Sequence, residues 1–156
     1  MGMSEASDGG FTLLEMVCVI ALVAMLAAVL LPFVPRNTSR ARLQAYALEA
    51  ASLLKADRNA AIRGGRDVTT LVDAPSRAIS SGATAQTLRI PEDVHFEALL
   101  PERCRQRPAL STISFFADGM SCGGAIALSR LDSSYEIRVN WLTGRIEIVS
   151  RNTRAN

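Results

Sequence analysis

A long apolar stretch interrupted by a single acid constrains this chain more than any other feature. Residues 16–31 are all apolar, and Thr12 and Glu15 are the only polar residues between position 11 and that run. At about 1.5 Å of rise per residue, a helix over residues 11–31 would be about 30 Å long, enough to cross the hydrocarbon core of a bilayer. Because it is apolar on all sides, the pattern predicts a helix for lipid or for a fully packed bundle.

Glu15 is the unusual residue of this segment, because an acid at the centre of a bilayer costs about 2.5–3.5 kcal/mol. One interpretation is local: Thr12 and Glu15 have the spacing of a capping box, and a carboxylate in the first turn suits the helix dipole. The other requires a cation at the same depth, and residues 11–31 contain no Lys or Arg. A cut after Gly10 would supply one, the new α-amino group of Phe11.

Residues 10–16 (GFTLLEM), followed by the apolar run, resemble the class III leader and N-terminal helix of type IV pilins and type II secretion pseudopilins. The resemblance implies that a prepilin peptidase cuts between Gly10 and Phe11 and that Phe11 is N-methylated. It also implies that Glu15 neutralises the N-terminal amine of a neighbouring subunit, which sets the axial register of the subunit in a filament.

The charges around the apolar run depart from the pattern of the family. Leaders of such proteins commonly carry Lys or Arg, whereas residues 1–10 contain neither and instead hold Glu5 and Asp8. The basic residues that follow the run are Arg36, Arg40 and Arg42. A positive-inside count would therefore put the C-terminal part in the cytoplasm. Since the cleavage motif is more specific than this count, we expect a cytoplasmic leader and a periplasmic C-terminal domain.

A secretory signal peptide is the alternative for the N-terminus. Such a peptide has a basic n-region, a shorter apolar core and a small-x-small cleavage site after it. Here the basic region is missing and the apolar run is long, although the alanine-rich residues 25–29 could imitate a cleavage site. The prepilin interpretation is therefore favoured.

Charge, cysteine and motif content limit the chemistry of the chain. Seventeen basic and 15 acidic side chains give a net charge of +2, too weak a bias to indicate a nucleic-acid partner. Cys18 lies in the apolar run, while Cys104 and Cys122 could pair in an oxidising periplasm or remain unrelated thiols. There is no C-x-x-C, and His95 is the single histidine. Phosphate-loop and nucleophile–base patterns are also missing, so no catalytic residue, metal or cofactor is expected.

A second, amphipathic helix is predicted to follow the prolines at positions 32 and 35 and to end at Gly64-Gly65. The expected apolar stripe consists of Leu43, Ala47, Ala50, Leu54, Ala61 and Ile62. The expected solvent-facing residues are Arg42, Glu49, Lys55, Asp57 and Arg58. Such a stripe has to be buried against another element.

The rest of the chain reads as short strands separated by turn signals. The predicted strands are residues 67–72, 77–80, 86–90, 94–99, 112–117, 124–130, 135–141 and 145–150. In the strand over 135–141, Tyr135, Ile137, Val139 and Trp141 are expected to share one face. The predicted fold is α+β, with a long N-terminal helix packed on an antiparallel β-sheet domain.

Three C-terminal segments sharpen the family resemblance. Residues 113–119 (ISFFADG), Gly123-Gly124 and residues 139–145 (VNWLTGR) resemble the β-domain of H-type minor pseudopilins, the GspH and FimT grouping. The implied organisation is a cleaved prepilin leader over 1–10, a transmembrane half-helix over 11–34, an amphipathic half-helix over 35–65 and a periplasmic β-rich domain over 66–156.

The resemblance implies a single-pass inner-membrane protein that helps to initiate or cap the periplasmic pseudopilus of a type II secretion system. Implied partners are other minor pseudopilins, the major pseudopilin, the prepilin peptidase, the inner-membrane assembly platform and, before assembly, membrane lipid. The alternative is a FimT-like minor type IV pilin that binds DNA during uptake through Arg145, Arg151 and Arg154. Glu147 interrupts that basic cluster, so a nucleic-acid partner is not expected.

Overall fold

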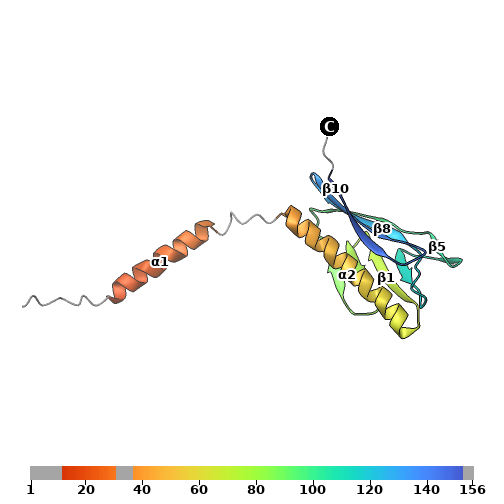
Figure 1. Cartoon of the computed structure of the whole chain (residues 1–156). Helices are drawn as coiled ribbons and strands as arrows, with labels where there is room; N and C mark the ends of the chain where they lie inside the picture. The colour runs from red at the N-terminus through yellow and green to blue at the C-terminus, as the bar shows by residue number, and fades with distance from the viewer. Residues whose placement is uncertain (1–11, 31–36, 153–156) are drawn as a thin grey trace, which may run out of the picture. The chain divides into compact units, whose positions relative to one another are not determined.

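The computed structural model describes residues 12–30 and 37–152, and the chain divides into two compact units between Asn37 and Thr38. The first unit contains helix α1 (Leu13–Leu30), and the second contains helix α2 (Arg40–Gly64) and the strands β1 to β10 (Figure 1). The predicted cleavage and methylation residues, Gly10 and Phe11, lie outside the described residues.

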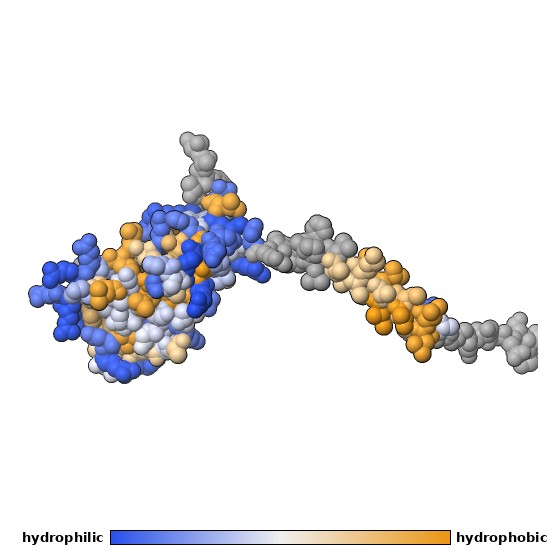
Figure 2. Space-filling view, turned by 180° about the vertical axis from the view of Figure 1, so that it is seen from behind, coloured by the Kyte–Doolittle hydropathy of each residue, from blue (hydrophilic) through white to orange (hydrophobic). Residues whose placement is uncertain are grey.

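Helix α1 begins with a local cap. The backbone N–H of Glu15 donates to the carbonyl of Thr12 at 3.0 Å and to its Oγ1 at 3.3 Å. The Thr12 side chain therefore accepts one of the two hydrogen bonds of the predicted capping box. The face of α1 visible in Figure 2 is hydrophobic except near its N-terminal end.

No helix within the described ranges is both long enough and apolar enough to cross a membrane. The predicted span over residues 11–34 includes positions outside those ranges, and it stays a prediction.

Helix α2 has caps at both ends. The Ser39 side chain accepts a hydrogen bond from the Arg42 N–H, and Gly65 ends the helix with φ of 58° while donating its N–H to the Ala61 carbonyl. Its buried residues are Leu43, Ala47, Ala50, Ala51, Leu53, Leu54, Asp57 and Ala61. The predicted position of this helix and its glycine stop are thus confirmed.

Two residues of α2 lie on the opposite face of the helix from the one predicted. Ile62 is 42% exposed, although it was expected in the apolar stripe, and Asp57 is fully buried, although it was expected in solvent. The helix packs on two sheets, so its buried face is wider than one stripe and includes Ala51 and Leu53. Asp57 lies on this wide face opposite polar groups that attract its carboxylate.

Two antiparallel four-stranded sheets form the β-part of the second unit. The first has the order β3-β2-β1-β7, with β1 (Val68–Asp73), β2 (Ala78–Ser80), β3 (Thr87–Arg89) and β7 (Thr112–Phe115). The second has the order β10-β9-β8-β4, with β4 (His95–Leu99), β8 (Gly124–Arg130), β9 (Ser133–Val139) and β10 (Ile146–Asn152). A separate hairpin pairs β5 (Arg103–Cys104) with β6 (Arg107–Pro108). All eight predicted strands are present, whereas the two-residue strands of the hairpin were not predicted.

The core lies between α2 and the two four-stranded sheets. In Figure 1, α2 crosses the β-layer lengthwise, and it contacts β1, β7, β8, β9 and β10. The largest fully buried apolar side chains include Phe115, Leu54, Ile79, Ile126, Leu128 and Ile137, which come from the helix and both sheets. Burial of each such side chain contributes about 1.5–3 kcal/mol. This arrangement confirms the predicted α+β fold.

The end of β9 differs from the prediction. Tyr135, Ile137 and Val139 are buried as expected, but Trp141 is 67% exposed because it lies beyond the last residue of the strand. The carboxamide oxygen of Asn140 accepts the N–H groups of residues 142 and 143 at 2.9 and 3.0 Å. This turn, held by the Asn140 side chain, ends the strand, so the alternation of buried and exposed residues does not continue to Trp141.

Candidate assembly and partner-binding sites

Glu15 is the only charged residue of α1, and its side chain is exposed in the first turn. No Lys or Arg occurs within Leu13–Leu30. A counter-charge for its carboxylate must therefore come from outside this helix.

A disulfide joins Cys104 to Cys122, whose Cα atoms lie 5.6 Å apart. This separation is typical of disulfides. The bond closes a loop with a sequence separation of 18, which on the loop-entropy model stabilises the fold by about 3 kcal/mol. It ties the β5–β6 hairpin to the segment before β8, while Cys18 is a free, exposed thiol.

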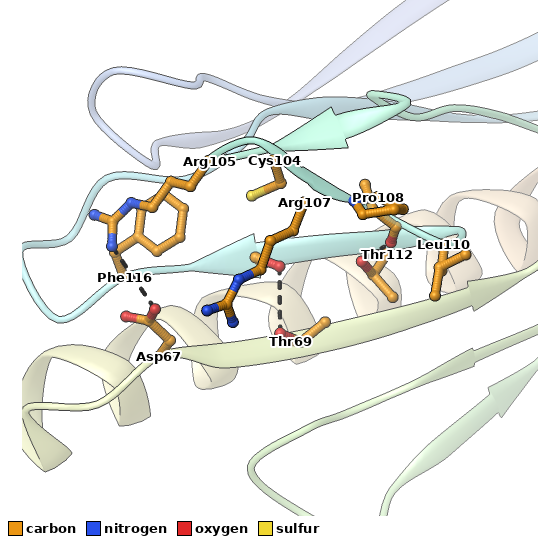
Figure 3. A pocket seen from close by; sticks show the side chains of 11 residues that line it. Asp67, Thr69, Cys104, Arg105, Arg107, Pro108, Leu110, Thr112 and Phe116 are labelled. Carbon is orange, nitrogen blue, oxygen red and sulfur yellow. Dashed lines mark hydrogen bonds and ion pairs between the residues drawn. The ribbon is translucent and has the colours of Figure 1, made fainter.

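An open groove of about 570 Å³ lies between the β5–β6 hairpin and the first sheet (Figure 3). Thr69 on β1, with Thr112 and Ser114 on β7, contributes hydroxyl groups to its lining. The hairpin contributes Arg105 and Arg107. We call this feature the hairpin groove.

The two arginines of the hairpin groove differ in their surroundings. The Arg105 guanidinium lies 3.5 Å from the centre of the Phe116 ring and pairs with Asp67 at 3.8 Å and with Asp118 at 3.6 Å. Among the described residues, the guanidinium of Arg107 has no hydrogen-bond or ion-pair partner, although its backbone pairs with Cys104 in the hairpin, and Figure 3 shows its side chain extended over the strands of the floor. Arg105 is therefore held in place, and Arg107 is the unneutralised cation of the groove.

Ion pairs cover the outer face of the second sheet. Glu136 pairs with Arg138 at 2.8 Å and with Arg151 at 3.0 Å, and Arg145 pairs with Glu147 at 2.9 Å. The hydrogen bond from Arg138 is the main reason that the pKa of Glu136 is lowered. Two of the three arginines considered for DNA binding thus already have acidic partners, and the third, at position 154, lies outside the described residues.

A polar cluster fixes the start of α2. The Asp93 carboxylate accepts the Thr38 backbone N–H at 2.6 Å and the Thr38 hydroxyl at 2.9 Å, and it pairs with Arg130 at 3.0 Å. Arg130 also donates to the Thr38 carbonyl at 2.7 Å. The backbone hydrogen bond from Thr38 is the largest cause of the lowered pKa of Asp93. The cluster attaches the first residue of the second unit to β8 and to the turn before β4.

A second polar cluster surrounds the buried carboxylate of Asp57. It accepts hydrogen bonds from the Thr70 hydroxyl at 2.6 Å, from the Ser81 hydroxyl, and from the N–H groups of Gly82 and Ala83 at 3.1 Å each. These donors come from β1 and from the loop between β2 and β3. The carboxylate therefore connects α2 to the first sheet.

The sequence pointed to some of these features and missed others. It named Cys104 and Cys122 as a possible pair, without deciding between a disulfide and two unrelated thiols, and it placed Glu15 in the first turn of an apolar helix. It missed the hairpin groove, although the basic run over residues 103–107 (RCRQR), which contains a cysteine, was a usable signal. No pattern in the sequence indicated the clusters around Asp93 and Asp57.

Solved structures of other proteins share the fold of this chain. The chain is similar to the minor pseudopilin EpsH from the type 2 secretion system of Vibrio cholerae, with a TM-score of 0.55, 12% identity, and coverage of 69% of this chain and 95% of EpsH. It is also similar to the type IV minor pilin FimU of Pseudomonas aeruginosa, with a TM-score of 0.51, 19% identity, and coverage of 72% and 91%. At these identities the likeness shows the fold alone, which is that of pilin-like minor subunits.

Sequence comparison is more specific. Residues 6–31 match the family model described as the prokaryotic N-terminal methylation motif. The chain is 31% identical over 138 residues to type II secretion system protein H of Xanthomonas campestris pv. campestris, covering 88% of this chain and 80% of that protein. The chain belongs to the type II secretion system protein H family, and it is a minor pseudopilin.

Proposed function

We propose that this minor pseudopilin helps to initiate or cap the periplasmic pseudopilus that moves folded exoproteins across the outer membrane. The observation that carries the proposal is the single charge of α1: Glu15, exposed in the first turn of a helix with no cation of its own. A buried acid without a counter-charge is costly in an apolar environment, so the residue fits a helix that meets a cation on assembly.

In this mechanism the prepilin peptidase cuts between Gly10 and Phe11, and Phe11 is N-methylated. Before assembly α1 lies in the inner membrane, with the second unit in the periplasm. On entry into the pseudopilus, α1 packs among other apolar helices, and the Glu15 carboxylate pairs with the amino group of a neighbouring subunit. The match of residues 6–31 to the methylation motif supports this sequence of steps.

The proposed partners are other minor pseudopilins, the major pseudopilin and the inner-membrane assembly platform. The role assigned to the chain is structural, without a catalytic residue. Relationship to a type II secretion protein supports secretion rather than DNA uptake. The ion pairs of Arg145 and Arg151 also leave fewer free cations for phosphate groups.

The test is Glu15→Gln, which keeps the size of the side chain and removes its charge. We expect incorporation into the pseudopilus and secretion of exoproteins to fall about tenfold or more, while the level of the protein in the membrane is unchanged. Incorporation is measured by cysteine cross-linking to neighbouring pseudopilins, and secretion by exoprotein activity in the medium.

Glu49→Gln is the matched control, because Glu49 is an exposed acid on α2. It should leave both readouts at the wild-type level. Normal incorporation of the Glu15→Gln protein would contradict the proposed pairing.

A further inference from the structure

We propose that the hairpin groove binds an extended acidic segment of a protein partner and that Arg107 holds a carboxylate of that segment. The inference deepens the proposed function and rests on it for the identity of the partner as a neighbour in the pseudopilus. Binding of a carboxylate in the groove can be measured independently of assembly.

The shape of the groove suits a peptide rather than a compact small molecule. It is an open feature of about 570 Å³ with a floor made by neighbouring strands β1 and β7. The roof is the β5–β6 hairpin, which lies across the groove from these two strands (Figure 3). An extended chain can follow such a groove while successive side chains alternate between its floor and the solvent.

The charges of the groove select an anion. Asp67 and Asp118 neutralise Arg105, which is also held against Phe116. Arg107 has no such partner within residues 12–30 and 37–152. A guanidinium can bind a carboxylate through two parallel hydrogen bonds, so the free cation is matched to Asp or Glu side chains.

The hydroxyl groups of the floor provide a second contact for a carboxylate. Thr69 Oγ1 and Ser114 Oγ lie 3.2 Å apart, and either can be the donor. When one hydroxyl donates to the other, the second keeps its hydrogen free for a ligand oxygen. The Thr112 hydroxyl already donates to the Ala109 carbonyl, so it is not available in the same way.

The same groove is poorly suited to nucleic acid. Binding to a phosphodiester backbone requires several unneutralised cations along its track. Here the Asp67 carboxylate is part of the lining, Asp118 pairs with Arg105, and only one lining arginine lacks an acidic partner among the described residues. A peptide with isolated carboxylates meets less repulsion than a continuous chain of phosphates.

The disulfide keeps the roof of the groove in position. Two-residue strands such as β5 and β6 are too short to be stable alone. The bond between Cys104 and Cys122 attaches this hairpin to the segment that follows β7 and precedes β8. Reduction should therefore loosen the groove without removing its charges.

The experiment uses the full chain in a nonionic detergent and a fluorescein-labelled hexaglutamate peptide as the probe. Fluorescence anisotropy at low salt should show saturable binding to the wild-type protein. Arg107→Gln should weaken this binding about tenfold, and Arg107→Lys should weaken it less because the charge remains. Reduction of the disulfide should also weaken it.

Arg89→Gln is the matched control, since Arg89 is an exposed strand arginine on β3 that does not line the groove. It should change the affinity by less than about twofold. Three results would overturn the proposal: no binding of hexaglutamate by the wild type, equal binding by Arg107→Gln, or tighter binding of a labelled thymidine hexanucleotide than of the peptide. Failure of the Glu15 test would leave this titration unaffected, because the titration requires no filament.

Discussion

The buried carboxylate of Asp57 allows a quantitative test of how α2 is attached to the first sheet. We predict that Asp57→Ala destabilises the second unit by about 3–5 kcal/mol. Asp57 and Thr70 are both fully buried, so the Thr70 hydroxyl would lose its 2.6 Å acceptor in a place that water does not reach. The loop over residues 81–83 would lose its contact with the helix at the same time.

The magnitude follows from the four hydrogen bonds to the carboxylate. Hydrogen bonds to a charged group contribute about 1.5–3 kcal/mol each, or about 6–12 kcal/mol together. Burial of the carboxylate costs several kcal/mol, which offsets part of this gain. Ala83 N–H also has the Ser81 hydroxyl as an acceptor at 3.2 Å, so it is not left without a partner. The hydrogen-bond gain minus the cost of burying the carboxylate leaves the expected loss of about 3–5 kcal/mol.

The assay is thermal and urea unfolding of a fragment from Thr38 onward, which contains the whole described core. For a domain of this size, a loss of 3–5 kcal/mol corresponds to a decrease in Tm of about 12–20 °C. Glu49→Ala, on the exposed face of the same helix, should change the stability by less than about 0.5 kcal/mol. A loss below about 1 kcal/mol for Asp57→Ala would refute the assignment of this carboxylate as a connection between helix and sheet.

Two further predictions concern a turn and a carboxylate. Gly144→Ala should lower the free energy of unfolding, measured in urea, by about 2–4 kcal/mol, because φ is 61° and the new Cβ would lie 2.1 Å from the Gly119 carbonyl oxygen. The control is Gly65→Ala, which has a similar φ but open space around the new Cβ, and it should lower the free energy of unfolding by only about 1 kcal/mol. Asp93 has a pKa below its usual 3.8, so its stabilising effect is complete above about pH 4 and is lost as the pH falls through the lowered value. Asp93→Asn should make the free energy of unfolding depend less on pH in this acid range. An unchanged dependence would contradict a stabilising role for the contacts between Asp93 and Thr38.

Much of the fold was predictable because its signals are local. Strands separated by turns such as Asp118-Gly119 and Thr143-Gly144 follow from alternation and turn chemistry. The helix stop at Gly65 follows from the conformational freedom of glycine. The hairpin β5–β6 could not be found in this way, since two-residue strands carry no periodicity and its place is fixed by a disulfide.

By itself, the sequence determined the apolar helix with its single acid, the methylation motif, the eight longer strands and the family. The tertiary structure decided which side chains those elements bury. Asp57 is inside because donors from residues 70 and 81–83 meet it, and Trp141 is outside because Asn140 turns the chain before it. Periodicity describes the faces of one element, whereas burial depends on the surface that a distant segment places against it.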